Sequence, residues 1–278
     1  MKKLILCVTL VCAGIMTSCV DKNEEVDSGN PSWLGSSIYE TLRHPDQKIL
    51  TGSFNTYLRL IDDLGYTSTL SRTGSKTVFP ANDEAFERFF KHNDWGVKSY
   101  NELTDNQKKR LLYSSMIDNA LLLSMLPNVS NGGNGVVQGA AIKHATSVSV
   151  TDSVTHLYGA SQMPVNNSNW AKHYKNGIDV VEDNTRPMMV HFTREYMINN
   201  NITTGGAGSD FEILTGSPYT EGVAYIFGDP VVNGGNKTCQ NGYVHQLRDV
   251  LIMPGNMAQM VRADAETSLF ARILGYYS

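Results

Sequence analysis

Glycine and asparagine interrupt this 278-residue chain at short intervals, above all between Asn128 and Gly242. Both residues favour turns and rarely continue a long regular element. The pattern therefore favours a loop-rich surface over a bundle of long helices. Because 41% of the residues are apolar, the chain can still bury one good-sized core, and we expect one large domain with tails.

Residues 1–18 predict a secretory signal. Two lysines precede an apolar run from Leu4 to Ile15, and small polar residues follow it. The run is too short for a stable transmembrane helix, which needs about 20 apolar residues. The sequence Met16-Thr17-Ser18-Cys19 resembles the lipobox of bacterial lipoproteins, so we expect cleavage before Cys19 and a lipid on its thiol. An ordinary signal peptide with an incidental cysteine is the alternative.

The segment 19–37 is acidic and polar, and it predicts a flexible tether. Its first residues, Val20-Asp21-Lys22-Asn23-Glu24-Glu25, resemble the export tag of lipoproteins of the Bacteroidota. That resemblance implies a protein anchored in the outer membrane by its lipid and exposed on the cell surface.

The charge of the chain argues against a nucleic-acid binder, and its cysteine content argues against a disulfide-stabilised fold. Without Lys2 and Lys3 the chain has 21 basic and 27 acidic residues, whereas a nucleic-acid binder needs a basic face. Of the 4 cysteines, two leave with the signal and Cys19 carries lipid, so Cys239 has no partner for an intramolecular disulfide. Stability must therefore come from the core, and we expect Cys239 to be a small buried residue.

Three helices are predicted from local signals. Phe54, Tyr57, Leu58 and Ile61 form the stripe of an amphipathic helix over residues 53–64. Asn82 is placed to cap a second helix that follows a short buried strand, 77–79. Thr104 and Gln107 match a capping box, and the apolar pattern after them predicts a helix as far as Ile117.

The later part of the chain predicts mainly strands. Residues 131–135 form a turn signal, and alternation over 145–157 favours a hairpin. A short helix is expected over 193–199, and strands are expected at 224–227, 231–232 and within 242–254. Helices followed by strands in this order are typical of an α+β domain.

Two stretches resemble the signatures of the fasciclin domain. Thr77–Phe86 resembles the first signature and Asn241–Pro254 resembles the second, in the family's order. The resemblance implies a fasciclin domain over residues 38–256, with a twisted β-sandwich or wedge and helices packed on one side. The positions that carry it are Thr77, Val78, Phe79, Asn82, Phe86, Gly242, His245, Leu247, Asp249, Leu251 and Pro254.

The chain departs from these signatures at two places. Pro80-Ala81-Asn82 stands where the family has Ala-Pro-Thr, although Asn82 can cap a helix as Thr does. Arg248 occupies the position of the family's Asp, and the acid comes one residue later, at Asp249. The resemblance makes His245 a structural residue that forms hydrogen bonds near the first signature. Residues 257–278 resemble the start of a second fasciclin-type unit, or else form a C-terminal helix.

Catalytic and metal-binding patterns are not evident in the sequence. The 7 histidines lack ligand spacing, since His191 and Glu195 make a single i, i+4 pair. There is no nucleophile elbow and no credible phosphate loop. We therefore expect a non-enzymatic protein without a metal or cofactor.

Aromatic residues in polar sequence are the best candidates for ligand contact, because their rings can stack on sugars or anchor a partner. These are Trp95, Tyr100, Tyr158, Trp170, Tyr174 and Tyr219. Asp152-Ser153-Val154 resembles a short O-glycosylation acceptor motif of the Bacteroidota, which would modify Ser153.

The resemblances together suggest two functions. The first is adhesion at the cell surface, with an extracellular matrix protein, a glycan or another cell as partner. The alternative is an accessory lipoprotein that captures a nutrient for a TonB-dependent transporter of the outer membrane.

Overall fold

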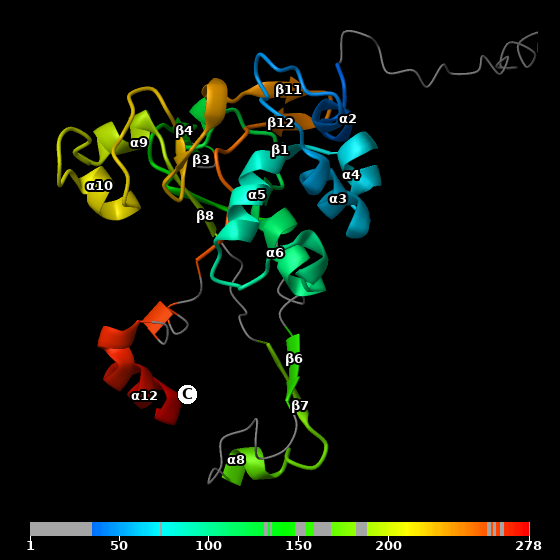
Figure 1. Ribbon diagram of the computed structural model, residues 1–278. Helices are drawn as coiled ribbons and strands as arrows, with labels where there is room; N and C mark the ends of the chain where they lie inside the picture. Colours follow the sequence, from blue (N-terminus) through cyan, green and yellow to red (C-terminus); the bar gives the residue numbers. More distant parts are fainter. Residues whose placement is uncertain are drawn as a thin grey trace, which may run out of the picture. The chain divides into compact units, whose positions relative to one another are not determined.

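The structure, a computed structural model, describes residues 35–277 except 73, 131–132, 134, 148–153, 158–167, 182–187, 255–256, 258–259 and 262–263. The predicted signal, Cys19, most of the tether, Ser153 and Tyr158 lie outside the described residues. The elements described below belong to a compact unit that spans residues 36–278. They confirm a mixed α+β fold (Figure 1).

The first sheet has the strand order β11-β12-β1-β2. Its central strands, β1 (Lys76–Val78) and β12 (Gly242–Val244), are parallel although they are far apart in sequence. The outer strands β2 (Met116–Ile117) and β11 (Lys237–Cys239) are antiparallel to their neighbours. Strands from the N-terminal and the C-terminal part of the domain therefore lie next to each other at the centre of this sheet.

The second sheet has the order β10-β9-β8-β5 and is antiparallel throughout. Its strands are β5 (Lys143–Ala145), β8 (Met188–Phe192), β9 (Tyr225–Ile226) and β10 (Asp229–Pro230). Two isolated bridges, Ile117 with Thr146 and Val231 with Leu247, join it to the first sheet. The two sheets are thus continuous through backbone hydrogen bonding.

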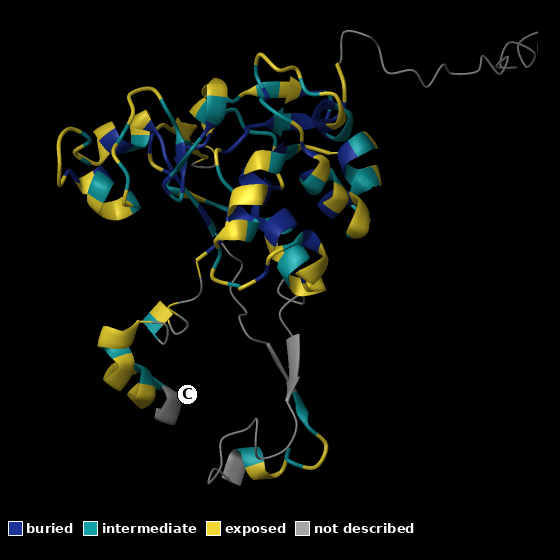
Figure 2. Cartoon of the chain, viewed as in Figure 1, coloured by how far each residue is buried: buried dark blue, intermediate teal, exposed yellow. Residues whose placement is uncertain are grey.

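Helices cover one face of the first sheet. They are α2 (Ile38–Arg43), α3 (Asn55–Asp63), α4 (Thr67–Arg72), α5 (Asp83–Lys91), the 3-10 turn η2 (Tyr100–Glu102) and α6 (Asp105–Ser114). Their buried faces pack with Val78 and Val244 in one apolar core. Figure 2 shows the buried side of α5 and α6 turned inward and their polar side exposed.

A second core lies between the two sheets. Phe79 and Ile117 come from the first sheet, and Met189 and Ile226 come from the second. Successive residues of an extended chain point to opposite faces, so Val78, the last residue of β1, enters the helical core while Phe79, which follows it, enters this one. A third cluster packs α9 (Arg194–Asn199) and α10 (Asp210–Thr215) on the second sheet through Phe192 and Phe211.

Two of the predicted helices are confirmed and one is shorter than predicted. α3 and α5 form where the apolar stripe and Asn82 predict them. α6 begins at its capping box but ends at Ser114, so the prediction that it continues to Ile117 is wrong. Met116 and Ile117 are extended instead, because β1 offers an open edge: Phe79 N donates to Ser115 O at 2.8 Å and Ser147 N to Met116 O at 3.0 Å.

The predicted strand within 242–254 is shorter as well. β12 ends at Val244, and two further bonds follow, from His245 N to Val78 O and from Leu247 N to Pro80 O, both 2.9 Å. Pro80 has no N–H to continue the ladder. The chain leaves the sheet there and remains without regular structure as far as Pro254.

The remaining elements are short. β3 (Val129–Ser130) and β4 (Val136–Val137) form a hairpin around the predicted turn, and β6 (Val154–Leu157) pairs with β7 (Ile178–Val181). The others are η3 (Leu123–Met125), α8 (Ser168–Ala171), η6 (Val232–Gly234), η7 (Ala265–Thr267) and α12 (Ser268–Tyr277). The confirmed helix 193–199 corresponds to α9.

Candidate functional site

The two segments that carry the resemblance lie side by side. Lys76, Thr77 and Val78 pair in register with Gly242, Tyr243 and Val244. A Cβ on Gly242 would overlap the carbonyl oxygen of Lys76, and its φ of 146° is one that side chains rarely allow. Only glycine therefore permits the two strands to approach at this point.

Thr77 is fully buried, and its hydroxyl forms hydrogen bonds with the segment that follows β2. Its Oγ1 donates to Asn119 O at 2.6 Å and accepts from Leu121 N at 2.8 Å. One buried hydroxyl thus serves two backbone groups of the segment after β2.

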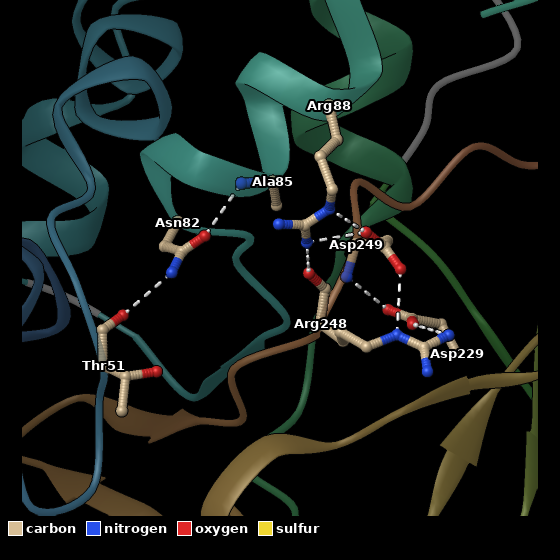
Figure 3. Close-up of polar contacts among 7 residues, drawn as sticks. All are labelled: Thr51, Asn82, Ala85, Arg88, Asp229, Arg248 and Asp249. Carbon is tan, nitrogen blue, oxygen red and sulfur yellow. Dashed lines mark hydrogen bonds and ion pairs between the residues drawn. The ribbon is translucent and has the colours of Figure 1, made fainter. Parts of the chain in front are cut away.

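Asn82 joins the start of α5 to a distant loop (Figure 3). Its Oδ1 accepts from Ala85 N at 2.9 Å, which caps the helix, and its Nδ2 donates to Thr51 O at 3.1 Å. Gly52 lies so close that a Cβ there would be 2.8 Å from the Asn82 amide nitrogen. The predicted cap is confirmed, and Phe86 of the same helix is buried in the helical core.

Asp249 forms an ion pair with Arg88 of α5, so the acid that comes one residue late in the second signature still contacts the helix of the first. Arg88 Nε and Nη2 lie 2.9 Å and 2.7 Å from Asp249 Oδ1, and Nη2 also donates to Arg248 O at 2.5 Å. Figure 3 shows the guanidinium between the two acceptors. The two segments are thus linked outside the sheet as well as within it.

Asp229 and Arg248 extend this network. Asp249 N donates to Asp229 Oδ2 at 2.9 Å, and Arg248 Nη2 lies 3.5 Å from Asp229 Oδ1. Burial raises the pKa of Asp229 to about 6. Burial also acts to raise the pKa of Asp249, but the hydrogen bonds from Arg88 and Arg248 outweigh it and hold that pKa below its usual range.

His245 is buried and both of its ring nitrogens are engaged. Nδ1 accepts from Asn236 N at 2.9 Å, so Nε2 carries the proton and donates to Leu121 O at 2.9 Å. The ring packs on Phe79 with centroids 5.2 Å apart, and burial lowers the pKa of His245 to about 4. A neutral imidazole that holds two loops has no free nitrogen for acid–base chemistry.

The other signature residues lie in the apolar cores. Leu247 and Leu251 belong to the core between the sheets, while Pro254 is exposed at the end of the segment. The fold therefore uses nearly all of the candidate positions for packing or for internal hydrogen bonds.

Three of the candidate aromatics pack within the molecule. Trp95 lies edge-on to Phe89 at 5.7 Å. Tyr219 lies 5.2 Å from Phe211, and burial raises its pKa. Tyr100, predicted to be exposed, is buried, because its ring lies under Arg59 at 4.0 Å and its hydroxyl donates to Asp63 at 2.8 Å.

Trp170 and Tyr174 differ from these, because both lie in the connection between β6 and β7 and are half-exposed. Of the predicted contact residues that the structure describes, these two are the ones placed away from the clusters of the three apolar cores.

A buried histidine stacked on a half-buried one was not predictable from local sequence. His191 of β8 stacks on His144 of β5 with centroids 5.1 Å apart, and its two ring nitrogens have no hydrogen-bond partner. Burial, with a smaller effect of His144, lowers the pKa of His191 to about 3. Glu195, its i, i+4 neighbour in sequence, is exposed on α9.

Cys239 is buried, with Sγ 3.3 Å from Thr41 Oγ1, and burial raises the pKa of its thiol. It lines one side of a pocket of about 270 Å³ beside Gly242 and Tyr243. Among the described residues, no three His, Cys, Asp or Glu side chains are grouped as metal ligands. None of the helices in the described part of the chain combines the length and the hydrophobicity needed to cross a bilayer.

A comparison with protein-family models finds no family that matches this chain, and a comparison with curated proteins finds no match.

Proposed function

We propose that this protein is a fasciclin-type binding module, held at the bacterial cell surface by a lipid on Cys19, and that it acts in adhesion rather than catalysis. The observation that carries the proposal is the parallel pairing of β1 with β12. It brings together the two segments that resemble the fasciclin signatures.

The contacts around this pair support the proposal. Asn82, Arg88 and Asp249 connect the two segments outside the sheet, and His245 holds the loops that follow β2 and precede β11. The residues that connect the two segments thus stabilise the fold. The exposed surface is then free to determine the partner, as is usual for folds that host many functions.

Exposed apolar side chains on the second half of the domain support a role in binding. Apolar surface that a monomer leaves uncovered marks interaction sites when it is extensive. The exposed set includes Val136, Val137, Ile198, Ile213 and Leu214, which lie on β4, α9 and α10. Figure 2 shows the exposed sides of α9 and α10.

Mass spectrometry of the native protein tests the anchor. We expect the mature chain to begin at Cys19 with acyl groups attached, and we expect Cys19→Ala to release the protein from the membrane fraction. An unmodified Cys19 in the purified native protein would contradict the proposal.

Binding is tested with full-length protein in detergent on cells, matrix proteins and a glycan array. We expect at least one of these surfaces to retain the protein. The variant Ile213→Asp/Leu214→Asp changes two exposed side chains, so any loss of binding with an unchanged melting temperature would place the contact on α10. Absence of binding to every surface would overturn the proposal.

A pull-down from detergent-solubilised membranes separates adhesion from the alternative function. Recovery of a TonB-dependent transporter with the protein would favour nutrient uptake. Recovery of the protein without a transporter, from cells that adhere, would favour adhesion.

A further inference from the structure

The connection between β6 and β7 carries a cluster of basic and aromatic residues. The two strands form a separate antiparallel ribbon in which Val154 pairs with Val181 and Leu157 with Ile178. The described part of the connection, 168–177, contains α8 and the turns after it (Figure 1). Trp170, Lys172, His173, Tyr174 and Lys175 lie within six consecutive positions.

The charge of this segment is opposite to that of the chain as a whole. The full chain has a net charge of -4, whereas residues 168–178 contain lysines and no aspartate or glutamate. Local positive charge on an acidic protein directs anionic partners to one place, because like charge elsewhere disfavours other contacts.

Backbone hydrogen bonds fold the segment into successive turns. His173 N donates to Trp170 O at 2.9 Å, and Gly177 N donates to His173 O at 2.8 Å. Trp170 and Tyr174 are half-exposed, while Lys172 and Lys175 are exposed. The turns therefore keep the four residues within one short folded segment.

We propose that this segment, the basic tip defined by Trp170, Lys172, Tyr174 and Lys175, binds an acidic polysaccharide. Aromatic faces suit the C–H faces of sugar rings, and lysine ammonium groups pair with carboxylate or sulfate substituents. The inference rests on the proposed function, because a surface protein is the kind that meets such polymers.

The composition of the tip favours a glycan over a lipid surface. Binding to a membrane interface requires apolar side chains that bury themselves between acyl chains. Besides the half-exposed Trp170 and Tyr174, the exposed residues among 170–177 are Ala171, Lys172, Lys175 and Asn176, so this segment has two rings but no large aliphatic side chain to insert among acyl chains. The polar groups of the segment match hydroxyls and acidic substituents instead.

Calorimetric titration of the full-length protein tests the proposal with chondroitin sulfate and polygalacturonate as acidic probes and dextran as the neutral one. We expect the protein to bind at least one acidic probe, more weakly as salt rises, and dextran not at all. Lys172→Ala/Lys175→Ala removes two ion pairs and should weaken binding roughly tenfold. The matched control Lys48→Ala/Lys91→Ala removes the same charge at two other exposed positions and should leave the affinity unchanged.

Trp170 provides an independent readout. Trp170→Phe keeps an aromatic face and should retain most of the affinity, whereas Trp170→Ala should lose it. Circular dichroism of each variant shows whether the fold is intact.

Three outcomes would overturn the inference: no binding to either acidic probe, equal loss in the two double-lysine variants, or stronger binding to phosphatidylglycerol vesicles than to the acidic glycans. The proposed adhesion function fails separately. It fails if the wild-type protein binds an acidic probe but is retained by neither cells nor matrix proteins, and that result leaves the glycan assignment standing.

Discussion

At the scale of single residues, buried side-chain amides form hydrogen bonds to backbone groups that would otherwise be made by a neighbouring peptide group. Asn241 Oδ1 accepts from Ile38 N and its Nδ2 donates to Leu70 O, both at 2.8 Å. Gln246 bonds both N and O of Thr51, at 2.7 Å and 2.9 Å. An amide offers a donor and an acceptor, as a peptide group does, so it can extend a sheet toward a loop that contributes no strand.

We expect Asn82→Ala to lower the free energy of unfolding by about 2 kcal/mol, because the helix loses its cap and Thr51 O loses a donor. Asn82→Asp keeps the cap acceptor and loses the donor, so about 1 kcal/mol is expected. Urea denaturation of the full chain measures both. Asn106→Ala, at an exposed position of α6, is the control. An Asn82→Asp variant as stable as the wild type would contradict the second role of Asn82, the bond to Thr51 O.

Acid should destabilise the protein through its buried histidines. The pKa of His191 is about 3 and that of His245 about 4 in the folded state, against 6.5 for an unperturbed histidine. Between these values the unfolded chain binds more protons, so stability is present above pH 6.5 and is lost as pH falls. Each group contributes about 2 kcal/mol of loss between pH 7 and pH 5.

His191→Phe should remove the part of the acid-induced loss of stability that comes from the protonation of His191. Phenylalanine needs no hydrogen bonds, and it can occupy a site where the imidazole nitrogens have none. The expected result is a smaller change in urea midpoint between pH 7 and pH 5. In Asp229→Asn the change should be larger than in the wild type, because the raised pKa of that carboxyl opposes the trend. An unaltered pH dependence in His191→Phe would show that the pKa of His191 is the same in the folded and unfolded states.

At the scale of elements, α5 is fixed at both ends. Asn82 joins its first turn to the loop before α3, and Arg88 joins its last turn to the segment after β12, 161 positions away. The helix is therefore bonded at its first turn to the loop before α3 and at its last turn to the segment after β12.

A double-mutant cycle of Arg88→Met and Asp249→Asn measures this link. Both side chains are about half exposed, at 51% and 43%, so solvent screens the pair. We expect a coupling free energy of about 0.5–1 kcal/mol that decreases in 0.5 M NaCl. The exposed pair Arg194 and Glu221 serves as a reference for a weaker contact. A coupling of zero would show that the pair with Asp249 does not contribute to holding α5 in place.

Local signals made α3, α5 and the start of α6 predictable, because an apolar stripe, a cap and a capping box act within a few residues. Strand β2 was not predictable, since Met116 and Ile117 continue the helical spacing and become extended only through β1. The ion pair of Arg88 was hidden for the same reason. In the sequence Arg88 belongs to the polar face of a helix, and no local pattern indicates that Asp249, 161 positions away, is its partner.

At the scale of the whole molecule, both sheets depend on one shared core. Phe79, Ile117, Met189 and Ile226 pack together, and the bridges at Thr146 and Val231 continue the backbone pairing. The faces that the two sheets turn toward each other are buried only when both sheets are formed. We therefore expect the sheets to unfold together.

Phe79→Ala should test this dependence. Removing a buried phenylalanine costs about 3–5 kcal/mol. Hydrogen exchange should show β8 and β9 losing protection together with β1 and β12. Phe90→Ala, which affects a half-buried ring on α5, should cost less and leave the second sheet protected. Loss of protection confined to the first sheet would mean that the two sheets are independent.

The distance in sequence between β1 and β12 also affects how the chain is made. At a synthesis rate of 5–20 residues per second, roughly 10–30 s separate the emergence of these two strands from the ribosome. During that interval β1 has β2 on one side and an unsatisfied parallel edge on the other, which is a hazard for aggregation. A nascent chain of this topology must stay bound to a chaperone or remain uncollapsed until its last strand arrives.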